Sequence, residues 1–257
     1  YMVMLAAFQV LLAKYSGSRD VVVGSPMAAR TRREVEEVVG FFTNTVALRT
    51  DLSGDPGFRT VLRRVREATL GAHEHQEIPF ERVVEELAPD RSASYAPVFQ
   101  VMFVQEAAER LVSGFSGVTL RREDAESGTS KFDLTLAFAT DDDGIGGSIE
   151  YGTDLFERAT IQRMLGHLER VLEQVTADAD LPVSALDLLA EDERRLVLSE
   201  WNRTDAPYPS DHCIHTLFEA QAARTPDAVA LVHERATLTY RQLNERANRI
   251  AHHLVPR

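Results

Sequence analysis

The chain opens on a segment that is apolar at almost every position, from Tyr1 to Ala13, followed by a polar stretch that reaches Gly17. A membrane-spanning helix needs ~20 apolar residues, so this segment is too short to be one. Apolar residues on all sides instead predict a helix that is buried nearly all round. Gly17 is typical of a helix end, because glycine adopts the left-handed conformation that closes many helices.

Runs of β-branched and alternating residues predict strands further along the chain. The first run ends at Pro26, and Asp141-Asp142-Asp143-Gly144 predicts a hairpin turn between two of the later runs. The predicted strands are Val21–Ser25, Asn44–Arg49, Val98–Val104, Phe132–Ala139, Ile145–Tyr151 and Ala228–Val232.

Apolar residues spaced by three and four positions predict helices between these strands. The helix that begins at Asp55-Pro56 has Phe58, Val61, Leu62, Val65 and Ala68 on its predicted inner face. The helix after Pro79 has Phe80, Val83, Val84 and Leu87 there, and the helix over 155–175 has Ile161, Leu165, Leu168 and Leu172. Residues 30–37 indicate a surface loop or short helix, and further helices are expected over 191–201, over 214–224 and from Tyr240. Helices interleaved with strands predict an α/β fold with a mixed sheet.

After residue 176 the regular alternation of predicted helices and strands gives way to a more polar stretch. Residues 202–211 contain Pro207, Pro209 and Ser210 and are typical of a linker. We therefore divide the chain into 1–176, a linker over 177–212, and a second domain over 213–257. The chain starts at Tyr1 without an initiator methionine and stops at Arg257 within a helical pattern, so we expect an internal, truncated piece of a longer protein.

Charge and cysteine content restrict the partners and the compartment. The 257 residues include 28 Lys and Arg against 40 Asp and Glu, a net charge of −12. Nucleic-acid binding needs a basic face, so no nucleic-acid partner is expected. The single cysteine, Cys213, excludes an internal disulfide framework. With no membrane segment either, we expect a cytoplasmic protein.

Four segments in fixed order resemble the core motifs of the condensation domain of nonribosomal peptide synthetases. They are YSGSRDVVVGSPMAAR (15–30), GFFTNTVALR (40–49), HEHQEIPFERVVEEL (73–87) and SKFDLTL (130–136). Residues 196–231 resemble the linker into the adenylation (AMP-binding) domain, and LTYRQLNERANRIAHHL (238–254) resembles the first motif of that domain. The resemblance implies the C-terminal lobe of a chloramphenicol-acetyltransferase-like fold. In this family two lobes meet around a tunnel.

The family reaction implied by the resemblance is amide formation between two thioesters, both held on phosphopantetheine arms of carrier proteins. The family's essential histidine, the second of an HHxxxDG motif, lies in the first lobe, and this chain has no such motif. Its one adjacent pair, His252-His253, is followed by Leu254 and no aspartate at the required spacing, so we interpret it as the polar face of the last helix. We expect no catalytic residue here and an inactive fragment.

The parent implied by the resemblance uses phosphopantetheine, ATP and Mg. None of these is expected to be bound by the fragment, because the adenylation domain's phosphate loop, pocket and lysine are absent from the sequence. Partners implied are the upstream and downstream carrier proteins, the missing N-terminal lobe and the remainder of the adenylation domain. His73 and His75 are two positions apart, which places them on different helix faces, so no metal site is expected.

The resemblance suggests which residues face the tunnel. Asn44 is the main candidate, since its amide could donate to a thioester carbonyl or accept from the amine. It could equally cap the turn before its strand. Gly24 and Ser25 lie at the end of their predicted strand, in the segment GSPMAAR that by the resemblance reaches toward the other lobe and the tunnel. Ala29 of this segment stands at a position that is usually glycine in the family.

Other residues are expected to support the site. Phe41 and Phe42 are interpreted as core, and Asp133 either pairs with an arginine or is a solvated charge at a strand end. The supporting residues predicted are Pro26, Arg30, Phe41, Phe42, Pro79, Phe80 and Asp133.

Three functions fit these observations. The first is a part of a modular peptide synthetase. The second is an epimerisation-type relative of the same fold, which the adenylation start directly downstream argues against. The third is a non-catalytic module that only docks carrier proteins.

Overall fold

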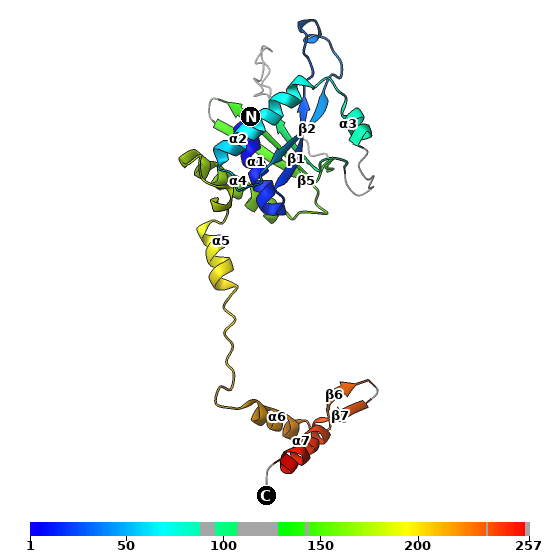
Figure 1. Ribbon diagram of the computed structural model, residues 1–257, viewed down its shortest axis with the longest axis vertical. Helices are drawn as coiled ribbons and strands as arrows, with labels where there is room; N and C mark the ends of the chain where they lie inside the picture. The colour runs from blue at the N-terminus through cyan, green and yellow to red at the C-terminus, as the bar shows by residue number, and fades with distance from the viewer. Residues whose placement is uncertain (88–95, 107–127, 142–143, 235, 255–257) are drawn as a thin grey trace, which may run out of the picture. The chain divides into compact units, whose positions relative to one another are not determined.

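The computed structural model describes residues 1–87, 96–106, 128–141, 144–234 and 236–254. Figure 1 shows the chain coloured from its N-terminus to its C-terminus. It divides into two compact units, Tyr1–Arg194 and Arg195–Arg257. Each unit is described by itself.

The first unit is built on a five-stranded mixed sheet with the order β2-β1-β3-β4-β5. Parallel pairing joins β1 to β3 and β3 to β4, while the outer strands β2 and β5 pair antiparallel with β1 and β4. This confirms the predicted mixed sheet. The strands are β1 (Asp20–Met27), β2 (Asn44–Asp51), β3 (Val101–Gln105), β4 (Leu134–Asp141) and β5 (Gly144–Tyr151).

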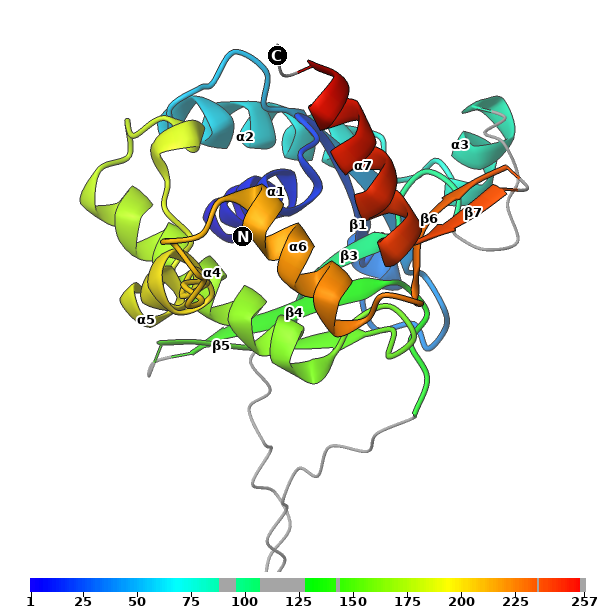
Figure 2. The ribbon, with the colours of Figure 1, turned by 90° about the horizontal axis from the view of Figure 1, so that it is seen from below.

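Three long helices pack together and against this sheet. They are α1 (Met2–Ser16), α2 (Phe58–Glu74) and α4 (Arg158–Ala177). Figure 2 shows α1 between α2 and α4, and α1 contacts both of them as well as β1. Gly17 ends α1 with φ 70°, and its N–H donates to the carbonyl of Ala13, as the sequence predicts.

Aromatic side chains form the centre of the core between α1 and the sheet. Phe103 of β3 is fully buried. Its ring centroid lies 5.2 Å from that of Tyr1, 5.9 Å from Phe8 and 5.3 Å from Phe138. Such ring separations are favourable for aromatic pairs, so Phe103 joins three segments of the chain.

Shorter elements complete the first unit. A 3₁₀ turn covers Arg33–Val35, α3 covers Phe80–Leu87, and a second 3₁₀ turn covers Val183–Ala185. The helix predicted over 191–201 is α5 (Glu191–Arg195) continued by a π-helical stretch, Leu196–Glu200. The unit boundary therefore falls inside this helix, and the residues of the predicted linker that precede Arg195 belong to the first compact unit.

The second unit contains α6 (Ile214–Arg224), β6 (Val229–His233), β7 (Ala236–Thr239) and α7 (Tyr240–Leu254). The four-residue strand β7, which pairs antiparallel with β6, was not predicted from the sequence. The backbone N–H of Tyr240 donates to the carbonyl of Ala228 at 3.0 Å, which ties the start of α7 to the residue before β6. Within the described ranges, no helix is both long and apolar enough to cross a membrane.

Two details of the first unit correct the sequence analysis. The predicted strand from Val98 starts only at Val101, because Val98 has φ 72° and the N–H of Phe99 donates to the carbonyl of Pro97. This three-residue turn is strained at a β-branched residue and cannot pair as a strand. The predicted inner face of α3 is also not buried, since Leu87 is 62% exposed.

Candidate functional site

A cleft of about 480 Å³ opens on the first unit between the start of β2 and the start of α3. Most of its walls come from two of the four motif segments, 40–49 and 73–87. The predicted site residues that line it are Phe41, Phe42, Asn44, Pro79 and Phe80. The structure thus brings residues more than thirty positions apart in the sequence into one concave surface.

Asn44 holds the two walls of this cleft together. Its Nδ2 donates to the carbonyls of Gln76 at 2.8 Å and Ile78 at 2.6 Å, and its Oδ1 accepts from the backbone N–H of Phe80 at 3.2 Å. The Phe80 N–H begins α3 and has no partner within the helix, so the amide caps α3 from a distant strand. These contacts give Asn44 a positioning role, and contact with a substrate stays a prediction.

Arg30 organises the loop before β2. Its guanidinium donates to the carbonyls of Val35, Glu36 (3.3 Å), Val38 (3.0 Å) and Gly40 (3.4 Å). It also lies 4.3 Å from the ring centroid of Phe42, a cation–π contact. The five N–H donors of a guanidinium suit such a set of carbonyls. Arg30 was predicted as a supporting residue, but the sequence does not indicate which groups it holds.

Phe41 is not a core residue in this chain. Its side chain is 90% exposed at the rim of the cleft, so the interpretation as core is wrong for it. Phe42 is only partly buried, beneath the Arg30 guanidinium. The reason is local: four carbonyls turn inward onto Arg30, and this directs the side chains of the loop tip outward.

Ala29 lines the same cleft and has φ 48°. A left-handed backbone costs an alanine roughly 1–2 kcal/mol, whereas glycine adopts it freely. By the family resemblance, glycine is usual at this position. The structure now gives a physical reason, because the backbone conformation at Ala29 is one that favours glycine.

Gly24 lies under an aromatic cluster that adjoins the cleft. A Cβ on Gly24 would lie 2.2 Å from Cε2 of Phe99. The Phe99 ring is 5.2 Å from Phe80 and 5.7 Å from Phe132, centroid to centroid. Gly24 therefore lets Phe99 sit against β1, and Phe99 in turn supports Phe80 in the cleft wall.

Ser25, the next residue of β1, is placed in the core rather than in the cleft. It is buried, its Oγ accepts from the hydroxyl of Tyr1 at 2.7 Å, and it donates to the carbonyl of Phe103 at 2.9 Å. Successive residues of a strand point to opposite faces of the sheet. Gly24 therefore lies on the side of the sheet that faces Phe99 and Ser25 on the side that faces the core, although both were predicted to face the tunnel.

Pro26 and Asp133 lie at strand ends. Pro26 pairs with Thr45 in the register of β1 and β2. The backbone N–H of Asp133 donates to the carbonyl of Gln100, and its carbonyl accepts from Gly152, both at 3.0 Å. Among the described residues no arginine forms an ion pair with the Asp133 carboxylate, so the first of the two alternatives given for Asp133 is not observed there.

Replacing Asn44 is expected to loosen the cleft. The variant Asn44→Ala removes three hydrogen bonds and should destabilise the first unit by about 1–2 kcal/mol. Asn44→Asp keeps the acceptor for Phe80 but turns a carboxylate toward two carbonyls, so it should cost at least as much. Hydrogen exchange of residues 76–87 measures both. Equal exchange in Asn44→Ala and wild type would contradict the positioning role.

The fold and the cleft define an α/β protein with a mixed-sheet lobe followed by a second, smaller unit. The sequence profile of the condensation domain matches residues 1–198, and the profile of AMP-binding enzymes matches residues 218–257. The chain therefore belongs to the condensation domain family. This confirms the resemblance drawn from the four motif segments.

Curated relatives align along almost the whole chain. Malpinin synthetase of Mortierella alpina is 45% identical over 99% of this chain, which spans 3% of that protein. Tyrocidine synthase 3 of Brevibacillus parabrevis is 45% identical over 98% of the chain, which spans 4% of that protein. A linear gramicidin synthase of Brevibacillus parabrevis is 41% identical over 99% of the chain, which spans 5% of that protein.

Solved structures agree with the fold. A four-domain nonribosomal peptide synthetase bound to AMP and glycine superposes with a TM-score of 0.76 at 25% identity, over 98% of this chain and 20% of that chain. The X-domain from teicoplanin biosynthesis, in complex with OxyB, gives a TM-score of 0.66 at 33% identity, over 74% of this chain and 43% of that one. The predicted fold class is thereby confirmed.

Proposed function

We propose that this chain works within a nonribosomal peptide synthetase, as the C-terminal lobe of a condensation domain joined by a linker to the start of an adenylation domain. One observation carries the proposal: a condensation match and an AMP-binding match follow each other in one chain. Relatives that are synthetases align across both parts.

In the proposed reaction the amine of an acceptor aminoacyl thioester attacks the carbonyl carbon of a donor thioester. The C–N bond forms, the C–S bond breaks, and the proton lost by the amine is balanced by the thiol that leaves on the donor carrier. A general base within hydrogen-bond reach of the amine assists this step. The sequence of this chain has no HHxxxDG motif, so that base comes from another part of the parent protein.

This chain contributes shape and support in that scheme. Asn44 fixes the start of α3 against β2, and Arg30 fixes the loop that carries Phe41 and Phe42. In this proposal the two residues fix the cleft walls that position a bound substrate arm, which is how positioning groups assist a reaction they do not touch. Phosphopantetheine enters as part of the carrier-bound substrates.

ATP and Mg²⁺ belong to the adenylation half of the proposal. The residues present do not fit them: the sequence has no glycine-rich phosphate loop, and no cluster of three or more potential metal ligands occurs in the described ranges. We therefore derive no step through ATP or Mg²⁺ for this chain.

The chain by itself is expected to form no amide bond. Two carrier proteins, one loaded with a donor and one with an acceptor aminoacyl group, would be mixed with the 257-residue chain and followed by intact-protein mass spectrometry. The same chain joined to its upstream lobe is the positive control and should give a peptidyl thioester. Product from the chain alone above the enzyme-free background would contradict the proposal.

A docking function is the second candidate. It is favoured by the 33% identity to an X-domain whose structure was solved in complex with OxyB, another protein. The two candidate functions predict different results for the chain joined to its upstream lobe. A condensation domain forms the amide bond, whereas a docking module binds its partner without forming one. The positive control above therefore also separates them.

A further inference from the structure

Residues 178–194, here called the strap, run back over the first unit after α4. The backbone N–H groups of Phe58 and Arg59 donate to the carbonyls of Leu181 (3.2 Å) and Ala179 (2.7 Å). The first N–H groups of a helix lack partners within it, so the strap satisfies the start of α2. Gly57 makes this approach possible, since a Cβ there would lie 2.7 Å from the carbonyl oxygen of Asp180.

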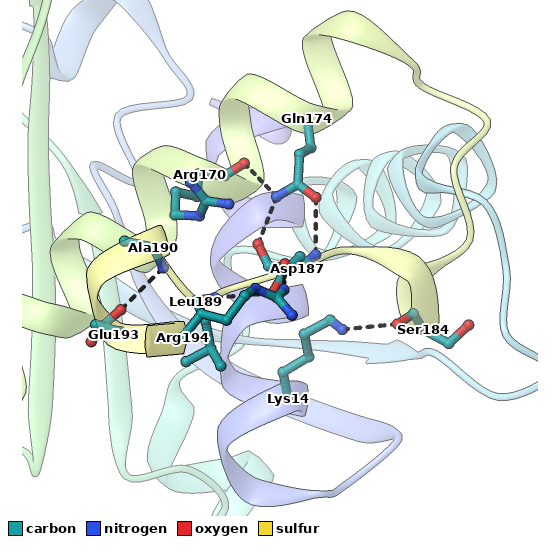
Figure 3. A network of polar contacts seen from close by, with 9 residues as sticks. All are labelled: Lys14, Arg170, Gln174, Ser184, Asp187, Leu189, Ala190, Glu193 and Arg194. Atoms are coloured by element: carbon teal, nitrogen blue, oxygen red, sulfur yellow. Dashed lines mark hydrogen bonds and ion pairs between the residues drawn. The ribbon is translucent and has the colours of Figure 1, made fainter. Parts of the chain in front are cut away.

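The middle of the strap is held by side chains from α1 and α4 (Figure 3). Lys14 donates to the carbonyl of Ser184 at 3.3 Å. The amide of Gln174 makes a paired contact with the backbone of Asp187: its Nε2 donates to the carbonyl at 2.8 Å, and its Oε1 accepts from the N–H at 2.9 Å. Arg194 then pairs with the carboxylate of Asp187.

The end of the strap is held by a buried histidine. His167 of α4 is 8% exposed, and its Nε2 lies 2.9 Å from Oε2 of Glu193. Its Nδ1 lies 2.7 Å from the hydroxyl of Tyr15, at the end of α1. The backbone N–H of Ala190 also donates to Glu193 Oε2 at 3.3 Å. One chain of contacts therefore joins α1, α4 and α5.

The chemistry of these groups fixes the direction of each hydrogen bond. An ionised carboxylate only accepts, so His167 carries a proton on Nε2, and in the Nε2–H tautomer Nδ1 accepts from the Tyr15 hydroxyl. The hydrogen bond from His167 lowers the pKa of the Glu193 carboxyl, and burial raises the pKa of the Tyr15 phenol. The lowered pKa keeps Glu193 an acceptor, and the raised pKa keeps the Tyr15 hydroxyl protonated as a donor. The other charged groups nearby are Arg163, facing Tyr15, and Asp192, beside Glu193.

We propose that Tyr15, His167 and Glu193 form a latch that fixes the end of the first unit and thereby sets the length of the free tether before α6. Glu193 lies immediately before the unit boundary at Arg194 and Arg195. With the latch closed, the free segment runs over 201–213. With it open, α5 is held to the strap by the half-exposed Arg194–Asp187 pair. Once that pair also separates, the free segment runs over 188–213 and has about twice the maximum reach. A longer tether lowers the effective concentration of one tethered unit near the other.

Hydrogen exchange and limited trypsin digestion of the whole chain test this latch. Glu193→Ala should speed both the exchange of residues 188–200 and the cleavage after Arg194 and Arg195 about tenfold, the effect expected for losing a hydrogen bond to a charged group. Tyr15→Phe removes only one neutral hydrogen bond and should have a smaller effect. Asp227→Ala, which removes the exposed pair with Arg241 in the second unit, is the matched control and should leave 188–200 unchanged.

Two measurements separate a latch from independent contacts. The double variant Tyr15→Phe/Glu193→Ala should show less than the summed effect, since both act through His167. Nitrogen-15 shifts of His167 should report the Nε2–H tautomer at neutral pH. Unchanged exchange of 188–200 in Glu193→Ala, strictly additive effects, or the Nδ1–H tautomer would each overturn the proposal.

The pH dependence follows from the Glu193 carboxyl. Its pKa is lowered in the folded protein, so its contribution is present above the unfolded pKa of about 4.3 and is lost as the pH falls through the folded value. Trp201, the sole tryptophan of the sequence, directly follows the helix that the latch holds. Its fluorescence anisotropy should be constant at pH values above the unfolded pKa and should fall as the pH drops through the lowered folded pKa of Glu193, with no such step in Glu193→Gln. The same step in that variant would overturn the assignment.

Discussion

Replacing Phe103 with alanine is expected to destabilise the first unit by roughly 3–5 kcal/mol. The side chain is fully buried, and its ring packs on those of Tyr1, Phe8 and Phe138. Removing it leaves a cavity at the point where α1, β3 and β4 meet, and these backbones are too constrained by their neighbours to collapse into it. A urea titration followed by circular dichroism, with hydrogen exchange of 101–105, measures the loss.

Phe41→Ala is the matched control, since it is the same substitution at a residue that is 90% exposed. It should change the stability of the first unit by no more than about 0.5 kcal/mol. A stable Phe103→Ala variant, or a destabilised Phe41→Ala variant, would contradict the division between core and rim. The pair also separates stability from function, because Phe41 lines the cleft and Phe103 does not.

The parts of the fold that local chemistry determines could be predicted from the sequence. Gly17 ends α1 because its own backbone permits a left-handed turn, and Tyr240 begins α7 where the pattern places it. The hairpin of β4 and β5 also follows from its turn residues. In each case the determining interactions lie within a few residues of one another, which is the range that a pattern covers.

Where segments that are distant in the sequence meet, the pattern of apolar and polar residues does not predict the structure. Val98 belongs to an apolar run that predicts a strand, yet its positive φ delays the start of β3 to Val101 and directs Phe99 toward Gly24. Tertiary packing overrides the local preference there. Phe41 belongs to an apolar motif, yet the carbonyls of its loop turn onto Arg30 and leave it exposed.

In the candidate site, too, some features could be predicted from the sequence and others depend on contacts between distant segments. The sequence predicted Asn44 as a tunnel residue and Pro79 and Phe80 as supports, and all three line the cleft. It left open whether the Asn44 amide faces a substrate or a turn, because that depends on the carbonyls of Gln76 and Ile78. His167 was missed altogether. The available signal was a histidine on the buried stripe of α4, among Met164, Leu168 and Val171.

Gly24→Ala is expected to destabilise the first unit by about 1–3 kcal/mol, the usual cost of overpacking a filled core. The added methyl group would lie 2.2 Å from Cε2 of Phe99. Phe99 is buried between Phe80 and Phe132, so its ring cannot retreat without moving them. Because Phe80 also lines the cleft, faster hydrogen exchange is expected in residues 76–87 as well as in β1.

Gly71→Ala provides a control of opposite sign. Gly71 lies inside α2, and a Cβ there would meet nothing within 4 Å. Alanine should stabilise the helix by about 0.5–1 kcal/mol, because glycine loses more conformational freedom on folding. The same chemical change is thus expected to lower stability at Gly24 and raise it at Gly71, and a urea titration of both variants measures the difference.

A compensating change identifies the cause at Gly24. Phe99→Leu shortens the side chain that the new methyl group would meet, so Gly24→Ala/Phe99→Leu should be less destabilised than the sum of the two single variants. Additive losses would mean that the ring is not what Gly24 makes room for. Recovery in the double variant, together with restored protection of residues 76–87, would show that a glycine in β1 positions the cleft wall through Phe99 and Phe80.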